Sequence, residues 1–228
     1  MKRLVVLSGA GVSKESGINT FRDSGGLWEQ YPVEDVASID GWRRNRSLVL
    51  EFYNARRRDL KDRQPNEAHR IIAGLERDFK VTVITQNVDN LHERAGSSDI
   101  IHLHGELTKA RGEFSPEPIY DIGYRDIHLG DKDSRGEQLR PHIVWFGEAV
   151  PMIEPAAETV SGCDILLVIG TSLNVYPAAG LINYIRGGVP VFLIDPHPMS
   201  LNYKHYTQIQ DVATSGMRKF RDICASLL

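Results

Sequence analysis

Short apolar runs recur along this chain, and polar stretches separate them. Five runs are apolar nearly throughout rather than alternating between apolar and polar residues: 4–7, 81–85, 100–103, 165–169 and 189–194. Continuous apolar runs of this length are typical of strands that are buried on both faces of a parallel sheet. We therefore expect a parallel sheet at the centre of the protein.

Helical patterns separate several of the expected strands. Residues 67–75 follow Pro65 and have apolar residues at helical spacing. Residues 178–185 follow Pro177 and end before a Gly-Gly pair at 187–188, which is usual start and stop chemistry for a helix. Strands that alternate with helices predict a doubly wound α/β fold, in which helices cover both faces of a parallel sheet.

Two stretches interrupt this alternation. Residues 34–64 are strongly helical and rich in arginine, whereas residues 109–140 are polar and contain many glycines and prolines, which predicts irregular structure. We expect both stretches to be inserts that form a small domain over one edge of the sheet. The main domain would then consist of residues 1–33, 65–108 and 141–228.

Length and composition indicate one soluble globular unit with a small insert. The chain has 228 residues, of which 41% are hydrophobic and 25% charged. Its net charge of −3 creates no field that would attract nucleic acid or an anionic membrane. No run approaches the roughly 18 apolar residues of a membrane span, and residues 4–7 are fewer than the about 7–15 of a secretory signal. Two cysteines provide no disulfide framework. We expect a cytoplasmic protein that binds neither nucleic acid nor membranes.

Polar side chains follow the second and third expected strands. Gln86, Asn87 and Asp89 come directly after the second run, and the third run leads into His102 and His104. In open parallel sheets, ligand-binding crevices lie beyond the carboxyl ends of the strands. Amide, carboxylate and imidazole groups at that position therefore predict a reaction site.

A Gly-Ala-Gly turn at residues 9–11 follows the first expected strand. Glycines at this position allow the backbone to turn tightly and to approach a pyrophosphate. Because Lys14 occupies the last position of a GxGxxG pattern, a plain structural turn remains an alternative. Phe21, Arg22 and Trp28 follow in a glycine-containing stretch, where they would either contact a dinucleotide or belong to a solvated loop.

Five segments, taken together, resemble the sirtuin family of NAD-dependent protein deacylases. They are GAGVSKESGINTFR at 9–22, TQNVDNLHERAG at 85–96, HLHGEL at 102–107, RPHIVWFGE at 140–148 and GTSLNVYPAAGL at 170–181. They span almost the whole chain in the family's order, which is far more specific than any single motif. The resemblance implies a Rossmann-like NAD-binding domain, a small domain made of the inserts, and a cleft between them for NAD and an acylated lysine of a protein substrate.

The resemblance also implies a role for individual residues along the bound NAD. The expected contacts are Gly9, Ala10 and Gly11 at the phosphates; Phe21 and Arg22 over the nicotinamide end, with Thr20 and Trp28 in the same stretch; Asn87, Val88 and Asp89 at the nicotinamide pocket, with Gln86 near the ribose; Gly170, Thr171 and Ser172 at phosphate and ribose; and Asp195, His197 and Ala213 at the adenosine end. Asp195 replaces the asparagine that the family commonly has there. The expected substrate-binding segment contains Val144, Phe146 and Gly147.

His104 matches the catalytic histidine of the family. The resemblance implies that the substrate amide oxygen attacks the nicotinamide ribose, after which a general base deprotonates a ribose hydroxyl. An imidazole suits that task because its unperturbed pKa lies near 6.5. The alternative is a metal bound by His102 and His104, but such a site needs a third ligand, and the sequence has no second His-x-His pair.

Tyr53 and Arg56 lie three residues apart in an expected helix, 48–63, and therefore project from the same side. The pair resembles the Tyr-x-x-Arg of sirtuins that remove succinyl and malonyl groups. A guanidinium matches a carboxylate through two parallel hydrogen bonds, and a phenol adds a third donor. The alternative is a solvated basic helix face, because residues 56–58 are three consecutive arginines.

Sirtuins usually bind a structural zinc through two pairs of cysteines in the small domain. The segment between Leu107 and Arg140 contains no cysteine in this sequence, so we expect no zinc. We expect ion pairs and apolar packing to hold the insert in its place. The apolar residues available for this packing are Phe114, Ile119, Tyr120, Ile122 and Tyr124.

These patterns lead to one favoured function and two alternatives. We expect a monomeric, NAD-consuming protein-lysine deacylase that favours succinyl and malonyl groups, also removes acetyl, and produces nicotinamide and O-acyl-ADP-ribose. The first alternative is a sirtuin-like ADP-ribosyltransferase or NAD hydrolase, which the degenerate insert keeps open. The second is an NAD-sensing binding module, which the complete set of His104, Asn87 and Asp89 disfavours.

Overall fold

A six-stranded parallel sheet forms the centre of the computed structural model, which describes residues 1–19 and 31–227. Its strand order is β3-β2-β1-β7-β8-β9, and every neighbouring pair is parallel. The strands are β1 (Arg3–Ser8), β2 (Lys80–Thr85), β3 (Ile100–His102), β7 (Ile165–Ile169), β8 (Val191–Ile194) and β9 (Tyr206–Ile209). The five strands that the apolar runs predict are confirmed. The edge strand β9 escaped prediction because Thr207 and Gln208 interrupt its apolar pattern.

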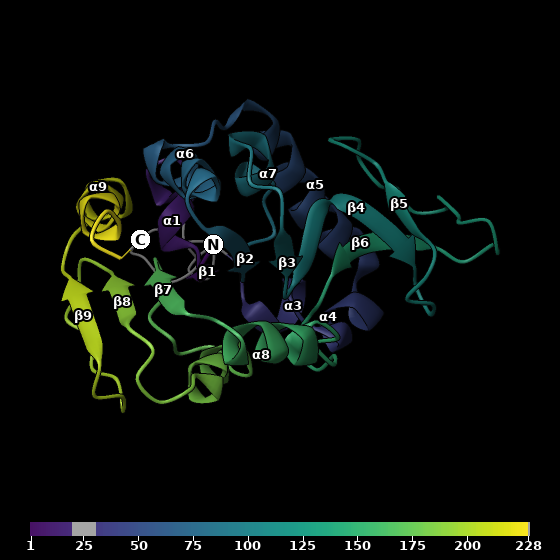
Figure 1. Ribbon diagram of the computed structural model, residues 1–228. Coiled ribbons are helices and arrows are strands. Elements are labelled where there is room, and N and C mark those ends of the chain that lie inside the picture. Colours follow the sequence, from purple (N-terminus) through teal and green to yellow (C-terminus); the bar gives the residue numbers. More distant parts are fainter. Residues whose placement is uncertain (20–30, 228) are drawn as a thin grey trace.

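Helices cover both faces of this sheet (Figure 1). On one face lie α6 (Glu67–Gly74) and α9 (Ala213–Cys224), and on the other α8 (Ile153–Ser161) and the 3-10 helix η2 (Ala178–Tyr184). The side chains of β1 alternate between the two layers: Leu4 and Val6 pack toward α6, whereas Val5 and Leu7 pack toward α8. The expected Rossmann-like α/β arrangement is therefore confirmed, although residues 178–184 form a 3-10 helix.

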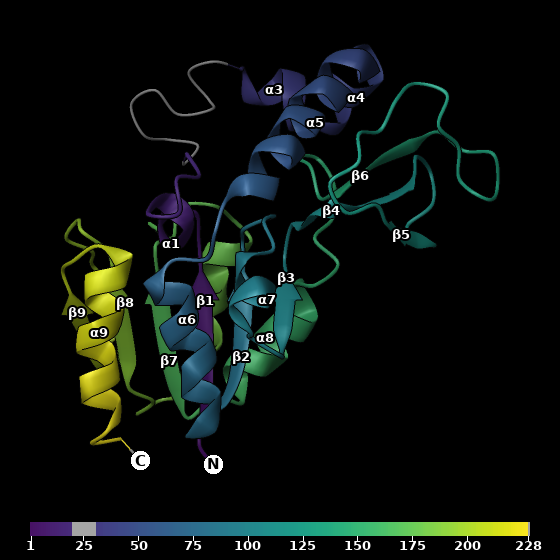
Figure 2. The ribbon, with the colours of Figure 1, turned by 90° about the horizontal axis from the view of Figure 1, so that it is seen from above.

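A second, three-stranded antiparallel sheet lies beside the first and has the order β5-β4-β6. Its strands are β4 (Gly105–Gly112), β5 (Ile119–Asp121) and β6 (Leu139–Ile143). The helices α3 (Val33–Val36), α4 (Ile39–Arg44) and α5 (Arg46–Asp62) pack against it around Trp42, Tyr53 and Trp145. Figure 2 shows these helices and strands beyond one end of the large sheet.

The irregular structure expected for residues 109–140 is wrong where β4, β5 and β6 form. The register of β4 against β6 shifts between Glu106 and Ala110. This shift interrupts the alternation of buried and exposed residues in β4, so the sequence of this strand shows no regular period of two. The packing expected in the insert is also partly wrong. Phe114 and Ile119 are 78% and 36% exposed, whereas Ile122 is buried against the second sheet's core.

Three short helical segments complete the described part of the chain: α1 (Gly11–Lys14), the 3-10 helix η1 (Leu75–Arg77) and α7 (Leu91–Ala95). Among residues 1–19 and 31–227, no helix has the length and apolar content that crossing a membrane requires.

Candidate functional site

The strand order reverses at β1, and this reversal places a crevice at the carboxyl end of the sheet. The chain runs outward from β1 through β2 to β3, and later returns to β7 on the opposite side of β1. Ligands of open α/β sheets bind outside the carboxyl ends of the strands at such a switch point. The loops after β1, β2 and β7 meet there, on the same side as α5 and the second sheet (Figure 2).

The Gly-Ala-Gly turn after β1 packs directly against the turn after β7. The amide of Gly9 donates to the carbonyl of Ile169 at 3.0 Å, and that of Gly11 donates to the carbonyl of Gly170 at 2.8 Å. A Cβ at Gly11 would lie 2.7 Å from the Cα of Gly170, and Gly170 itself has a φ of +63°. Glycine is required here for backbone packing; Gly9 is buried in the turn, and Ala10 and Gly11 are half-buried.

Asn87 and Asp89 converge on Ser13 of α1, which was not singled out as a site residue from the sequence. The Asn87 amide donates to the Ser13 hydroxyl and to the Gly9 carbonyl, each at 3.2 Å. The Ser13 hydroxyl in turn donates to Asp89 Oδ2 at 3.0 Å. All three side chains are buried, so the geometry of Asn87 and Asp89 is defined by hydrogen bonds to the turn after β1.

His69 of α6 also contacts this network through Ser13, and it too was not predicted from the sequence. The backbone N–H of Asn66 donates to His69 Nδ1 at 3.3 Å, so the ring proton resides on Nε2, which faces Ser13 Oγ at 3.4 Å. Burial lowers the pKa of His69 to about 4 and raises the pKa of Asp89. His69 is therefore neutral, and no cation neutralises Asp89 from that side.

His104 follows β3 and is oriented by the backbone. Its Nδ1 lies 3.0 Å from the carbonyl oxygen of Gln86. Because a carbonyl only accepts, Nδ1 carries the proton, and Nε2 of the neutral ring keeps a lone pair. Burial lowers the pKa of His104, and the carbonyl of Gln86 only partly offsets this effect. The ring is therefore neutral at pH 7, as a general base must be.

Tyr53 and Arg56 of α5 lie next to one another near this crevice. The Tyr53 hydroxyl accepts a hydrogen bond from the Trp145 indole at 3.0 Å. The Arg56 guanidinium lies 5.7 Å from the Tyr53 ring centroid and 5.4 Å from that of Phe52. Burial lowers the pKa of Arg56, while Tyr53 and the carboxylate of Asp89 act in the opposite direction. Tyr53 packs in the same apolar cluster as Val88 and Leu91, which places the pair beside the Asn87–Asp89 loop.

The segment that contains Val144, Phe146 and Gly147 runs between the two sheets. The Val144 amide donates to the His104 carbonyl at 3.0 Å, and Phe146 exchanges backbone hydrogen bonds with Ala37 and Ile39. Phe146 is 51% exposed, and Gly147 has a φ of +89°. The segment therefore presents an exposed side chain close to His104.

The remaining expected NAD contacts lie at the carboxyl ends of the neighbouring strands. The Gln86 amide donates to Thr171 Oγ1 at 3.1 Å, and the Val88 carbonyl accepts from Leu107 at 2.8 Å. Asp195 accepts from the His197 amide after β8 at 2.9 Å. Two further expected contacts lie at the same edge: Ser172 is exposed in the turn after β7, and Ala213 is the first residue of α9. Outside the described residues are Thr20, Phe21, Arg22 and Trp28.

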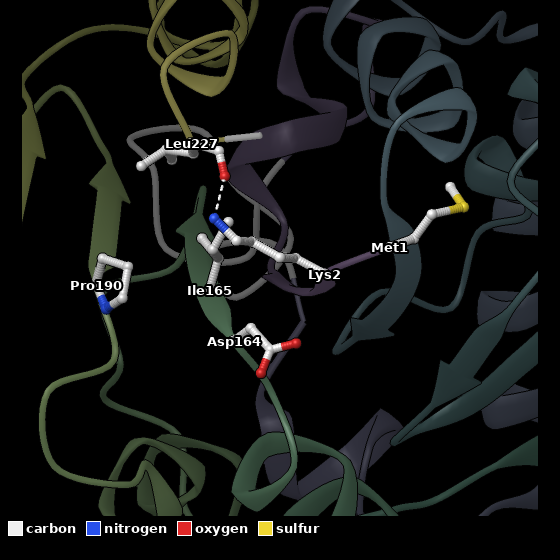
Figure 3. Close-up of a pocket in the computed structure, with 6 residues that line it drawn as sticks. All are labelled: Met1, Lys2, Asp164, Ile165, Pro190 and Leu227. Carbon is white, nitrogen blue, oxygen red and sulfur yellow. Dashed lines mark hydrogen bonds between the residues drawn. The ribbon is translucent and has the colours of Figure 1, made fainter.

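A hollow of about 540 Å³ lies at the opposite end of the sheet (Figure 3). It is lined by Met1, Lys2, Asp164, Ile165, Pro190 and Leu227. These residues lie at the chain termini and at the amino-terminal ends of β7 and β8. The hollow contains none of the expected site residues, so the carboxyl-end crevice is the candidate site.

Comparison with known proteins agrees with this geometry. The Sir2 family model matches residues 9–177. The chain is 59% identical over 229 residues, 98% of each chain, to an NAD-dependent protein deacylase of Bacteroides thetaiotaomicron. It is 47% identical to one of Helicobacter pylori, over 100% of this chain and 98% of that one. A Sir2 homologue solved as an NAD complex superimposes with a TM-score of 0.88 at 37% identity, covering 99% of this chain and 90% of that chain. The chain belongs to the Sir2 family.

Proposed function

We propose that this protein is an NAD-dependent protein-lysine deacylase that prefers succinyl and malonyl groups and also removes acetyl groups. Family membership and the activity for which its relatives are named support the deacylase reaction. The observation that supports the acyl preference is the placement of Arg56 and Tyr53 beside the crevice, where Tyr53 packs with Val88 and Leu91.

The reaction would use the crevice residues in distinct roles. Bound NAD supplies the ribose carbon that the acyl oxygen attacks. Asn87 and Asp89 would hold the nicotinamide carboxamide, since an amide and a carboxylate complement its acceptor and donor groups. His104 Nε2 would accept the proton of a ribose hydroxyl, so that this oxygen attacks the acyl carbon. Nicotinamide would leave when the acyl oxygen attacks the ribose carbon, and one water would be consumed in releasing the free lysine, so that the remaining product is O-acyl-ADP-ribose.

Arg56 would bind the carboxylate at the end of a succinyl or malonyl chain. The Trp145 indole occupies an acceptor site of the Tyr53 oxygen, so the phenolic hydrogen remains to be donated to the same carboxylate. A half-buried guanidinium makes stronger charge-assisted hydrogen bonds than one in bulk water. An acetyl group has no carboxylate and would gain nothing from either side chain.

The acyl preference is tested with NAD and matched acetyl-, malonyl- and succinyl-lysine peptides. Arg56→Met should lower kcat/KM for the succinyl peptide roughly 10- to 100-fold, because one or two charge-assisted hydrogen bonds are lost. Activity on the acetyl peptide should be spared. Tyr53→Phe should show a smaller loss in the same direction. Arg58→Met is the matched control, since Arg58 is an exposed arginine of the same helix that pairs with Glu51 and Asp126.

Equal loss of succinyl and acetyl activity in Arg56→Met would rule out a carboxylate-binding role for Arg56. The same assay, followed by nicotinamide release, separates the alternative activities. Nicotinamide released from NAD without any acyl peptide would identify an NAD hydrolase. No turnover of any acyl peptide would refute the deacylase proposal itself.

We also propose that the insert after β4 is held without zinc. Gly112, at the end of β4, faces two carboxylates: a Cβ there would lie 2.5 Å from Glu137 Oε2 and 2.7 Å from Asp133 Oδ2. Glu137 accepts from the Phe114 amide and the Ser115 hydroxyl, and Asp133 Oδ1 accepts from the amides of the turn that follows it. A glycine and two carboxylates that already bind the backbone do not fit the thiolate-rich sites of structural zinc. Hydrogen bonds across the insert would replace the metal crosslink.

A further inference from the structure

His102 and His104 hold two consecutive carbonyl groups of the loop after β2. His104 Nδ1 lies 3.0 Å from the Gln86 oxygen, and His102 Nδ1 lies 3.3 Å from the Asn87 oxygen. The parallel pairing of Thr85 with His102 brings the ends of β2 and β3 together, so that both rings reach the loop. The loop backbone is thus fixed at two neighbouring points by the same strand end.

The second ring nitrogen of His102 faces a carboxylate instead of the crevice. Nε2 lies 2.6 Å from Glu93 Oε1 of α7 and 4.0 Å from Glu106 Oε1 of β4. A carbonyl at one nitrogen and a carboxylate at the other both require a donor, so the ring is an imidazolium. Burial lowers the pKa of His102, but Glu93 and Glu106 outweigh it and the pKa is raised. The side chain is only 10% exposed.

The charges around His102 balance without a metal ion. Its imidazolium and the Lys109 ammonium, 2.6 Å from Glu106 Oε2, face the two carboxylates of Glu93 and Glu106. Asp89 lies on the loop side, where burial raises its pKa and the hydrogen bonds from Leu91 and Ser13, with the charge of His102, act in the opposite direction. The cluster therefore consists of hydrogen-bonded ion pairs that join α7, β3 and β4 to the loop after β2.

We propose that His102 is a positioning residue, whose Nδ1 fixes the backbone of the loop that presents Asn87 and Asp89 to nicotinamide. This inference rests on the proposed nicotinamide pocket. His102 touches neither NAD nor the acyl group. Its contribution is to keep the Asn87 carbonyl turned away from the crevice, so that the Asn87 amide stays on Gly9 and Ser13.

Two substitutions separate the contacts of the two ring nitrogens. The side-chain amide of His102→Asn can replace the Nδ1 donor, whereas that of His102→Gln can replace only the Nε2 donor. His102→Gln should raise the KM for NAD and the nicotinamide concentration for half inhibition about tenfold, as loss of one buried hydrogen bond predicts, and should change kcat less. His102→Asn should restore both quantities to within about threefold of wild type. Hydrogen exchange of the peptide covering 86–91 should be faster in His102→Gln alone.

The matched control is His128→Gln, because His128 is an exposed histidine in the insert. Equal defects in both His102 variants, together with a lowered melting temperature, would mean that His102 only stabilises the fold, and would overturn the proposal. Asn87→Ala distinguishes this failure from failure of the pocket. If Asn87→Ala changes NAD and nicotinamide binding while His102→Gln does not, the positioning role is wrong and the pocket stands. If Asn87→Ala changes neither, the nicotinamide pocket itself is wrong.

Discussion

His104 has its tautomer set by a main-chain carbonyl and its protonation state set by burial. The Gln86 carbonyl keeps the proton on Nδ1, and desolvation lowers the pKa of the ring. Both effects favour the neutral form with a free Nε2 lone pair, the form that acts as a base.

The pH dependence of kcat should reflect this lowered pKa. The rate should increase with pH through a pKa below the ordinary 6.5 and reach a plateau by neutral pH, because the active form is the deprotonated one. His104→Tyr should abolish deacylation at every pH while leaving NAD binding measurable by calorimetry. An ascending limb with its midpoint above pH 7 would contradict the assignment of His104 as a buried neutral base.

At the scale of elements, the segment between β6 and α8 depends on one carboxylate. Glu148 accepts from both terminal nitrogens of Arg140, at 2.7 and 2.9 Å, and from the Trp145 amide at 2.8 Å. The Arg140 guanidinium also lies 3.4 Å from the centroid of the Trp145 ring. This clamp fixes the chain that presents Phe146 and Val144 beside His104, so its integrity should affect substrate binding as well as stability.

Glu148→Gln should lower the free energy of unfolding by roughly 3 kcal/mol at pH 7, since it leaves the buried Arg140 charge without its partner. Burial raises the pKa of Glu148, but Arg140 and the Trp145 amide outweigh this effect and the pKa is lowered. The difference in free energy of unfolding between wild type and Glu148→Gln should therefore be complete above the ordinary carboxyl pKa of about 4.3. It should disappear as the pH falls through the lower pKa that Glu148 has in the folded state. Urea unfolding at several pH values measures it, with the exposed Glu154→Gln of α8 as control. A pH-independent difference would contradict the ion-pair explanation.

At the scale of the whole molecule, hydrogen bonds join α5 to the second sheet, and the Leu107 amide of β4 joins that sheet to the Val88 carbonyl after β2 at 2.8 Å. The buried Arg57 of α5 donates to the Leu107 carbonyl of β4 at 2.6 Å, and the Asn54 side chain donates to the Ile127 carbonyl and accepts from the Ile127 amide.

The two cysteines of the sequence, Cys163 and Cys224, are buried near the large sheet, and burial raises the pKa of each to about 11. They are therefore neutral thiols, which are poor zinc ligands.

Removal of divalent metal should leave the assembled molecule unchanged. Incubation with a chelator such as EDTA should shift neither the melting temperature nor deacylase activity, if, as we propose, hydrogen bonds of Asp133 and Glu137 hold the insert without a metal. Differential scanning fluorimetry and the peptide assay measure both quantities, and elemental analysis of the purified protein gives its zinc content. A zinc-binding relative from the same family provides the positive control. A fall of several degrees on chelation would contradict the zinc-free insert.

Prediction from the sequence succeeded where one local rule controlled the outcome. Strands buried on both faces must be apolar at every position, so the runs from 4–7 to 189–194 were visible as strands without any tertiary information. The motifs placed Asn87, Asp89 and His104 at strand ends, and parallel pairing brought these ends to one edge. The domain boundaries and the roles of the NAD-contacting residues stay predictions.

Prediction failed where the outcome depended on contacts between distant segments. Ser13 and His69 are unremarkable in sequence, and they matter because α1 and α6 bring them under Asp89. The strands of the insert were missed because they are polar and because a register shift between Glu106 and Ala110 breaks the alternation of β4. Phe114 was expected in a core but is exposed. The space beside the nearby Gly112 is occupied by the carboxylates of Glu137 and Asp133 and not by apolar side chains.

The sequence by itself determined the fold class, the family and the chemical groups available for the reaction, because these follow from local apolar patterns and contiguous motifs. Only the tertiary structure decided how those groups are used. The register of β2 against β3 turns the two histidines of one short motif toward different partners. His104 keeps a free nitrogen, whereas His102 is held between a carbonyl and a carboxylate. Two identical side chains two residues apart differ in charge because hydrogen bonding and burial, which depend on the whole fold, set the protonation of each.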